Sequence, residues 1–272
     1  MFPIINSEKL SPLVKWFCVE APDISAKSRA GQFVIVRANE KGERIPLTIA
    51  DFDGEKTIEL VVQEVGESTR IINLLDAGGA FLNIAGPLGH PSEIGRFGTV
   101  FCIGGGIGIA PVYPIARALK NAGNTIITIL GARSSDLIFW EDKFRSISDE
   151  VIITTDDGSY GKKGVVTEPL KEFIEKGDKI DRVVAIGPCV MMKYVSLATR
   201  DHGIKTIVSL NPIMLDGTGM CGGCRVEVGG ESKFVCVDGP EFDAHEVDFD
   251  LLMMRQSVYQ KEEQQCRLKG EL

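Results

Sequence analysis

The chain lacks the features that mark membrane, secreted or nucleic-acid-binding proteins. Its 272 residues contain no apolar run that approaches the length of a membrane span. Residues 1–6 lack the basic and apolar regions of a signal peptide, so we expect a cytoplasmic protein. The net charge is −8, which argues against nucleic acid as a main partner.

Cysteine and histidine are also scarce. Seven cysteines are too few for a disulfide scaffold at this length. Cys18, Cys102 and Cys189 lie among apolar residues and are expected to be buried, whereas Cys266 lies in a charged tail. The three histidines are expected at surface or capping positions. We therefore predict no catalytic side chain, and chemistry that cofactors carry.

The remaining three cysteines lie in the most informative segment of the sequence. Asp216, Cys221, Cys224 and Cys236 are four possible metal ligands, separated by four, two and eleven residues. Thiolates are soft ligands for iron, and the glycines between them let backbone N–H groups turn toward the sulfides of a cluster. The pattern predicts a [2Fe–2S] cluster held by one carboxylate and three thiolates.

Other interpretations of this segment remain open. Zinc ribbons usually pair two Cys-x-x-Cys motifs, and this chain has one. A thioredoxin-like dithiol begins a helix after a strand, whereas this motif lies in a glycine-rich loop. Asp216 has an alternative role as well, because aspartate often caps glycine turns.

The apolar pattern divides the chain into four parts. Residues 1–95 contain short, regularly spaced strand candidates, which predict a small antiparallel β-barrel. Residues 96–210 alternate strands and helices, which predicts a doubly wound parallel sheet with helices on both faces. Residues 211–248 form a small [2Fe–2S] cluster domain, and residues 249–272 a C-terminal helix and tail.

The expected elements follow from these patterns. The barrel strands are residues 14–20, 32–37, 45–50 and 58–65. The strands of the parallel sheet are residues 99–103, 125–130, 151–155, 182–186 and 204–210. The helices between them are residues 110–122, 139–146, 164–176 and 190–202. In the last two parts we expect a hairpin joining 225–228 to 233–237, and a helix over 249–268.

A glycine-rich turn joins the first strand of the second part to its first helix. Glycine permits close approach of the backbone to a pyrophosphate, and the helix start offers free N–H donors. A purely structural strand-to-helix turn is the alternative. The residues concerned are Gly104, Gly105, Gly106, Gly108 and Pro111.

Two barrel segments carry a second signal. The run from Arg44 to Thr48 brings a guanidinium and a hydroxyl together on one strand, suited to a phosphate and a ring system. Gly66, Ser68 and Thr69 open a probable helix whose hydroxyl and N–H groups suit another phosphate contact. Each segment alone also fits a solvated loop.

The order of these motifs resembles the ferredoxin–NADP reductase superfamily. With the C-terminal cluster loop, the chain is similar to the electron-transfer subunit of dihydroorotate dehydrogenase. It is more similar to the small subunits of NADH-dependent reduced ferredoxin:NADP+ oxidoreductases, also called sulfide dehydrogenase subunits. Asp216 in place of the first cysteine, and the run from Cys236 to Asp243, support the second group.

The resemblance implies a cofactor for each motif. For FAD it implies Arg44, Pro46, Leu47, Thr48, Val62, Gln63, Gly66, Ser68 and Thr69. For NAD(H) it implies the glycine turn together with Gly187 and Pro188. Ile186 replaces the cysteine of the usual Cys-Gly-Pro motif, so no catalytic thiol is assigned. From the residues alone, Arg133 suits a 2′-phosphate, and Asp157 suits a free ribose hydroxyl; the resemblance favours NAD(H).

The resemblance also implies an activity. It is hydride exchange between NAD(H) and FAD, followed by single-electron transfer to or from the [2Fe–2S] cluster. The implied partner in a heterodimer is a larger flavoprotein subunit with [4Fe–4S] clusters and a second FAD, which handles ferredoxin and NADP(H) in electron bifurcation. Two alternatives are a dihydroorotate dehydrogenase electron-transfer subunit and a non-catalytic redox sensor that uses the cluster.

Overall fold

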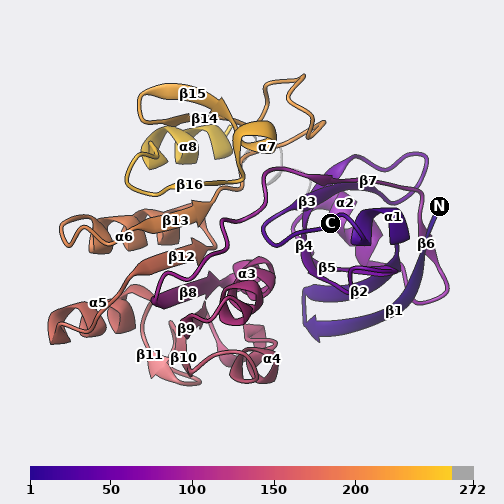
Figure 1. Cartoon of the computed structure of the whole chain (residues 1–272). Coiled ribbons are helices and arrows are strands. Elements are labelled where there is room, and N and C mark those ends of the chain that lie inside the picture. Colours follow the sequence, from indigo (N-terminus) through magenta and orange to yellow (C-terminus); the bar gives the residue numbers. More distant parts are fainter. Residues whose placement is uncertain (259–272) are drawn as a thin grey trace.

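The N-terminal part of the chain is a nearly closed antiparallel barrel (Figure 1). The computed structural model describes residues 1–258. Seven strands follow one another around the barrel in the order β6-β1-β2-β5-β4-β3-β7. They are β1 Phe2–Ser11, β2 Val14–Glu20, β3 Phe33–Arg37, β4 Ile45–Phe52, β5 Thr57–Gln63, β6 Ala80–Phe81 and β7 Asn83–Leu88. The barrel also carries two helices, α1 Pro22–Ser25 and α2 Glu67–Asn73.

Three of these strands, β1, β6 and β7, were not among the predicted ones. The side chains of β1 are mostly exposed or half-buried, and only Ile4 and Ser11 are buried. Its apolar alternation is therefore weak, although its pairing with β2 is nearly continuous. β7 contains Gly86 and Pro87, which are rare inside strands. Pairing with neighbouring strands, rather than local pattern, defines these elements.

The second part is a parallel sheet with helices on both faces, as predicted. Its order is β11-β10-β9-β8-β12-β13-β16, and only β16 runs antiparallel to its neighbour. The strands are β8 Thr99–Gly105, β9 Thr125–Ala132, β10 Glu150–Thr155, β11 Lys162–Lys163, β12 Arg182–Ile186, β13 Thr206–Ser209 and β16 Glu241–Asp243. The helices are α3 Ile109–Asn121, α4 Glu141–Arg145, α5 Thr167–Lys176 and α6 Cys189–Arg200, with short 3-10 turns at Gly106–Gly108 and Ser135–Leu137.

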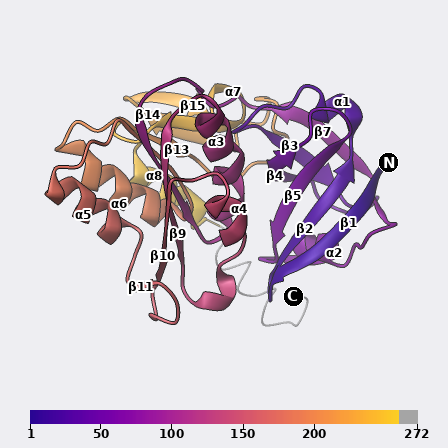
Figure 2. The same ribbon diagram turned by 60° about the horizontal axis from the view of Figure 1, so that its bottom comes forward.

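The two faces of this sheet have different neighbours. α3 and α4 pack on the face that also meets the barrel, in a core that includes Val14 and Ala50 of the barrel (Figure 2). α5 and α6 pack on the other face, in a core shared with the C-terminal elements. The sheet is thus held between the barrel and the C-terminal unit.

The C-terminal unit is a small hairpin with two helices. It consists of β14 Arg225–Val228, β15 Glu231–Phe234, α7 Val235–Asp238 and α8 Phe249–Gln256. The prediction of a strand over 233–237 is wrong in its second half. There the backbone turns into α7, where Val235 N–H donates to the Cys224 carbonyl at 3.2 Å, and this turn brings Cys236 beside Cys224. The predicted helix 249–268 begins as expected, and its residues from 259 onward lie outside the described part of the chain.

Two smaller predictions have definite outcomes. Cys102 and Cys189 are buried as expected, but Cys18 is only half-buried because it lies on β2 near the barrel surface. Cys266 lies outside the described residues. Within residues 1–258, no helix is both long and apolar enough to cross a membrane.

Candidate functional site

The two predicted NAD segments meet at the carboxyl edge of the parallel sheet. β8 and β12 are neighbours, yet the helices that follow them, α3 and α6, cover opposite faces. This is the switch point of a doubly wound sheet, where such folds bind ligands. A Cβ atom on Gly187 would lie 3.1 Å from the Gly105 carbonyl, so the two loops are in contact.

Glycine is needed at different positions of the first loop for different reasons. A Cβ on Gly104 would lie 2.9 Å from Ile109 Cα, and one on Gly108 would lie 2.1 Å from the Ile186 carbonyl oxygen. These two residues therefore let α3 pack closely on β8 and β12. Gly106 differs, because its φ is +54° and a Cβ there would meet nothing within 4 Å. Its backbone faces open space at the start of α3, as a phosphate contact requires.

Arg133 and Asp157 come together at the same edge of the sheet, after β9 and β10. Asp157 N–H donates to the Arg133 carbonyl at 3.2 Å, and both side chains are exposed. The Ser159 hydroxyl donates to the Asp157 carboxylate at 2.6 Å and lowers the pKa of Asp157. The Arg133 guanidinium and the ionised Asp157 carboxylate thus lie beyond the ends of β9 and β10, the two strands beside β8 on the side away from β12.

The predicted flavin strand, β4, presents its residues on two faces. Leu47 pairs with Val34 and packs at the edge of the barrel core. Pro46 and Thr48 alternate with it and pair with Ile35 and Phe33, whose side chains belong to the core shared with the C-terminal unit. Pro46 and Thr48 therefore lie on the outer face of the barrel, the face that meets the rest of the molecule.

The other predicted flavin residues lie at the end of β5, where Val62 is buried in the barrel core, and at the start of α2. Val62 and Gln63 lie beyond the stretch of β5 that pairs with β4. The Ser68 hydroxyl donates to the carboxylate of Glu43, the residue before the exposed Arg44. This hydrogen bond joins the start of α2 to the segment just before β4. The structure thus brings the predicted flavin segments together, although Glu43 and Ser68 are 25 residues apart in the sequence.

Thr69 has a structural task in this arrangement. Its hydroxyl oxygen accepts hydrogen bonds from Val65 N–H at 2.9 Å and Gly66 N–H at 3.0 Å. It also donates to the Gly66 carbonyl at 2.9 Å. Thr69 therefore fixes the turn at Gly66, and the hydroxyl at this helix start that faces outward is that of Ser68.

Asp216 caps the loop that carries the first cysteine. Its two carboxylate oxygens accept N–H hydrogen bonds from Thr218 and Cys221, each at 2.8 Å. These bonds, the one from Thr218 first, lower the pKa of Asp216. Each carboxylate oxygen keeps a second lone pair, so capping leaves Asp216 able to bind a metal.

Cys224 and Cys236 form a buried pair of thiols. Their sulfur atoms are 3.3 Å apart, and the residues are 1% and 2% exposed. Burial, and then the neighbouring Cys224, raise the pKa of Cys236, so a cation is needed to hold this pair as thiolates. Cys221 is exposed in the same loop. Three thiols and a carboxylate on one loop are a donor set that fits an iron–sulfur cluster. Within residues 1–258, no three His, Cys, Asp or Glu side chains gather at one point.

The cluster loop packs directly on the barrel. Gly217 has φ of +75°, and a Cβ there would lie 2.7 Å from Ile35 Cγ1 and 3.3 Å from Leu88 Cδ1. Ile35 is the β3 partner of Pro46. The residue next to Asp216 therefore touches the same outer barrel face as the predicted flavin strand.

Sequence reasoning missed two residues that shape these contacts. Ile35 looked like an ordinary strand residue, and nothing in its neighbours pointed to the cluster loop. Met191 lies under both nucleotide loops, because a Cβ on Gly105 would come 2.3 Å from its sulfur and one on Gly187 would come 2.7 Å from its methyl. Met191 lies four residues after Gly187, at the start of a helix. This spacing is the sequence signal for its contact with Gly187.

Comparison with known proteins identifies the domains of the chain. Residues 102–197 match the family model for the oxidoreductase NAD-binding domain. Residues 211–248 match the model for the iron-sulfur cluster binding domain of dihydroorotate dehydrogenase B. A solved structure of an NADH-dependent reduced ferredoxin-NADP oxidoreductase, described for flavin-based electron bifurcation, is 47% identical with a TM-score of 0.93 and covers 99% of this chain and 98% of that one.

Named relatives extend over nearly the whole chain. The dihydroorotate dehydrogenase B (NAD(+)) electron transfer subunit homolog of Thermotoga maritima is 49% identical, over 96% of this chain and 92% of the relative. The corresponding electron transfer subunit of Fusobacterium nucleatum is 31% identical, over 81% of this chain and 87% of the relative.

The barrel, the switch-point crevice and the cluster loop together define an electron-transfer oxidoreductase subunit of the ferredoxin–NADP reductase type. More particularly, the chain belongs to the family of dihydroorotate dehydrogenase B electron-transfer subunits and their homologues. The predicted cofactors, FAD, a [2Fe–2S] cluster and NAD(H), are supported by the two matched domains and by the flavin-based relative.

Two variants separate the capping and the ligand role of Asp216. Asp216→Asn keeps an oxygen that accepts N–H but is a poor iron ligand, whereas Asp216→Cys supplies a ligand but caps poorly. If Asp216 binds iron, we expect the cysteine variant to keep a [2Fe–2S] cluster with an altered EPR spectrum and potential, and the asparagine variant to have a labile cluster. Iron and sulfide content with EPR spectra measure this. The reverse order of cluster stability would assign Asp216 to capping alone.

Proposed function

We propose that this chain is the NAD(H)-binding subunit of an electron-bifurcating NADH-dependent reduced ferredoxin:NADP+ oxidoreductase. It exchanges hydride between NAD(H) and FAD and passes single electrons to or from a [2Fe–2S] cluster. The observation that carries the proposal is the contact of Gly217 with Ile35, because it puts the cluster loop on the barrel face of the flavin strand. Electron transfer between two cofactors requires such proximity.

The residues of the barrel hold and orient the flavin in this proposal. Arg44 and Ser68, joined through Glu43, would bind its phosphates, and Thr48 would hydrogen-bond its ring system. FAD supplies the exchange between hydride and single-electron chemistry. A ring system on the outer face of β4 would lie between the nucleotide domain and the cluster loop.

The nucleotide domain holds NAD(H) at its switch point. The open backbone at Gly106 and the N-terminus of α3 would bind the pyrophosphate. Gly187 and Pro188, in the turn after the neighbouring strand β12, would border the nicotinamide. The ionised Asp157 would accept a hydrogen bond from a ribose hydroxyl and repel a 2′-phosphate, which favours NAD(H) over NADP(H).

Each half of the cluster would have its own pair of ligands. Cys224 and Cys236 would share the buried iron, because their sulfur atoms already lie 3.3 Å apart. Asp216 and Cys221, joined by a backbone hydrogen bond of 2.8 Å, would share the other iron. Because Cys221 is exposed, an iron held there would be nearer the surface, where a partner could accept electrons.

The partner in this proposal is a larger flavoprotein subunit with [4Fe–4S] clusters and a second FAD, and it handles ferredoxin and NADP(H). A second candidate is the electron-transfer subunit of a dihydroorotate dehydrogenase, which the matched cluster domain favours. Purification of the native complex tests both. A partner with [4Fe–4S] clusters and NADH-dependent reduced ferredoxin:NADP+ activity supports the first, whereas dihydroorotate-dependent NAD+ reduction supports the second.

Arg44 provides a direct test of the flavin site. We expect Arg44→Ala to lose most of its FAD, because charge-assisted hydrogen bonds to phosphate are among the strongest in proteins. The control is Arg70→Ala in the same barrel, an exposed arginine whose partner is Glu67 at 2.7 Å. Flavin content and FAD affinity measure the effect. Unchanged affinity in Arg44→Ala would remove Arg44 from the phosphate site.

A further inference from the structure

An ion pair joins the barrel to the nucleotide domain. Arg117 Nη2 on α3 lies 2.6 Å from Asp51 Oδ1 on β4, and the Asp51 side chain is only 8% exposed. The guanidinium also lies over the rings of Phe52 and Tyr113, 5.7 and 5.8 Å from their centroids. Arg117 is therefore held from both domains. The Asp51 side chain is buried and the Arg117 side chain is 31% exposed, so the contacts from both domains, rather than burial alone, fix the guanidinium.

A second cation extends this contact. Lys143 of α4 places its Nζ 3.0 Å from Glu59 Oε2 and 3.9 Å from Asp51 Oδ2. Glu59 also accepts a hydrogen bond of 2.8 Å from Trp16 Nε1. The two acidic residues belong to the barrel and the two basic residues to the nucleotide domain, so the charges are complementary across the interface.

The backbone is strained at Trp140, three residues before Lys143. Trp140 has φ of +62°, and it is the one non-glycine residue with a positive φ in residues 1–258. Its ring lies under Lys143, with Nζ 4.0 Å from the centroid, and it meets Tyr113 edge to face at 5.7 Å. A bulky residue keeps such a conformation only where its surroundings fix it. The surrounding residues therefore fix the Trp140 ring in its position beneath Lys143.

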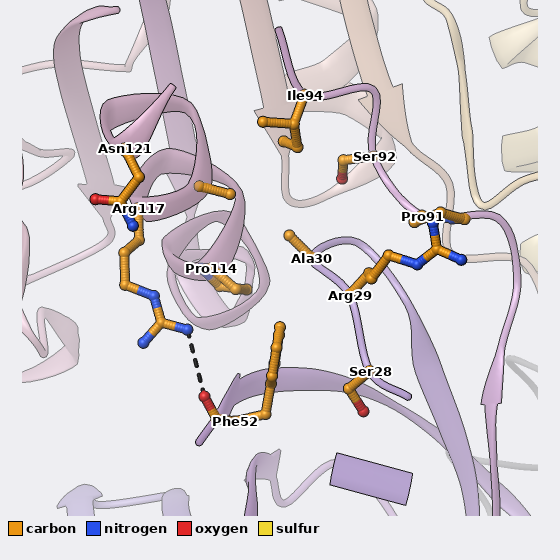
Figure 3. A pocket seen from close by; sticks show the side chains of 11 residues that line it. Ser28, Arg29, Ala30, Phe52, Pro91, Ser92, Ile94, Pro114, Arg117 and Asn121 are labelled. Atoms are coloured by element: carbon orange, nitrogen blue, oxygen red, sulfur yellow. Dashed lines mark hydrogen bonds between the residues drawn. The ribbon is translucent and has the colours of Figure 1, made fainter. Parts of the chain in front are cut away.

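A cavity lies in the interface beside this ion pair, and Arg117 is one of its lining residues. This cavity of about 530 Å³ separates the barrel from α3, lined by Ala30 and Phe52 on one side and Pro114 on the other (Figure 3). Continuous apolar packing therefore does not extend across this side of the interface. On this side of the interface the charged network joins the two domains, whereas the apolar core that contains Val14 and Ala50 joins them elsewhere.

The network holds the far ends of the two elements that carry the cofactor segments. Asp51 lies three residues after Thr48 on β4, about 10 Å along a strand. Arg117 lies nine residues after Gly108, about 13 Å along a helix. A tilt between β4 and α3 at the ion pair would shift the flavin strand relative to the nucleotide turn.

We infer that the Asp51–Arg117 pair, supported by Lys143 and Glu59, is a positioning device that sets the nicotinamide site against the flavin. The inference rests on the proposed hydride exchange between NAD(H) and FAD. Asp51 and Arg117 lie about 10 and 13 Å along their elements from the cofactor segments, so the pair acts through the alignment of β4 and α3. Small misplacements of reacting groups lower rates steeply.

The test uses the whole chain with its FAD and cluster, in the variants Asp51→Asn and Arg117→Gln. We expect both to keep flavin and cluster but to be reduced by NADH about tenfold to a hundredfold more slowly in anaerobic stopped-flow. The long-wavelength absorbance of the nucleotide–flavin pair should weaken, because it reports their overlap. The double variant should be no slower than the slower single variant, since both changes remove one pair.

The matched control is Lys120→Gln. Lys120 lies on the same helix and pairs with Asp149 at 2.7 Å inside the nucleotide domain, so the wild-type rate is expected. Wild-type rates in both test variants, loss of flavin from them, or an equal loss of rate in the control would each overturn the inference. Failure of the wild-type chain to accept hydride from NADH would instead refute the proposed function.

Discussion

Gly108→Ala is expected to abolish NADH oxidation while leaving FAD and the cluster in place. An added Cβ would lie 2.1 Å from the Ile186 carbonyl oxygen and 2.8 Å from Gly187 Cα. Both neighbours are backbone atoms, so the loops after β8 and β12 must move apart. Overpacking of this kind typically costs about 1–3 kcal/mol, and it separates the two halves of the predicted nucleotide site.

The measurements are the KM for NADH, the rate of flavin reduction and the thermal unfolding temperature. Gly95→Ala is the control, because the Cβ added there would meet only the ring of Phe97, at 3.2 Å, and a side chain can turn aside. A Gly108→Ala protein with normal NADH kinetics would show that the crevice between β8 and β12 is not the nucleotide site.

The second large effect is expected from the buried thiol pair. Cys224→Ser and Cys236→Ser should each lose the cluster, because a buried hydroxyl is a poorer ligand for iron than a thiolate. Flavin reduction by NADH should persist, since the flavin and nucleotide segments lie in other parts of the chain. Reduction of one-electron acceptors through the cluster should fall by more than about tenfold.

Iron content, acid-labile sulfide and EPR spectra measure this loss. Cys189→Ser is the matched control, since Cys189 is also buried and a serine there can donate to the Phe249 carbonyl, 3.9 Å from the present sulfur. A full iron and sulfide content in either cluster-loop variant would place a ligand elsewhere in the chain.

Local features of the chain were predictable from sequence. The glycine turn from Gly104 to Gly108 lies between an apolar strand and a helix, and each part has its own periodic pattern. The same holds for the alternation of strands and helices that builds the parallel sheet. The four candidate cluster ligands were predictable too, because their spacing and the glycines between them are chemical rather than topological signals.

Contacts between distant segments were not predictable. The contact of Gly217 with Ile35 and the pairing of Asp51 with Arg117 each join residues from different domains. Neither residue pair has a local pattern, since a glycine in a turn and an arginine on a helix have many possible neighbours. The strand β1 was not predicted for a related reason: its pairing with β2, rather than apolar alternation, defines it.

An anaerobic NADH titration of the purified chain, followed by visible and EPR spectra, tests the central claim most directly. The claim is that hydride enters at the crevice between β8 and β12 and leaves as single electrons through the loop of Asp216 and the three cysteines. The account predicts one FAD and one [2Fe–2S] cluster per chain, bleaching of the flavin by NADH, and the appearance of a reduced-cluster EPR signal. Stoichiometric zinc without acid-labile sulfide, or a reduced flavin beside a cluster that NADH leaves oxidised, would contradict it.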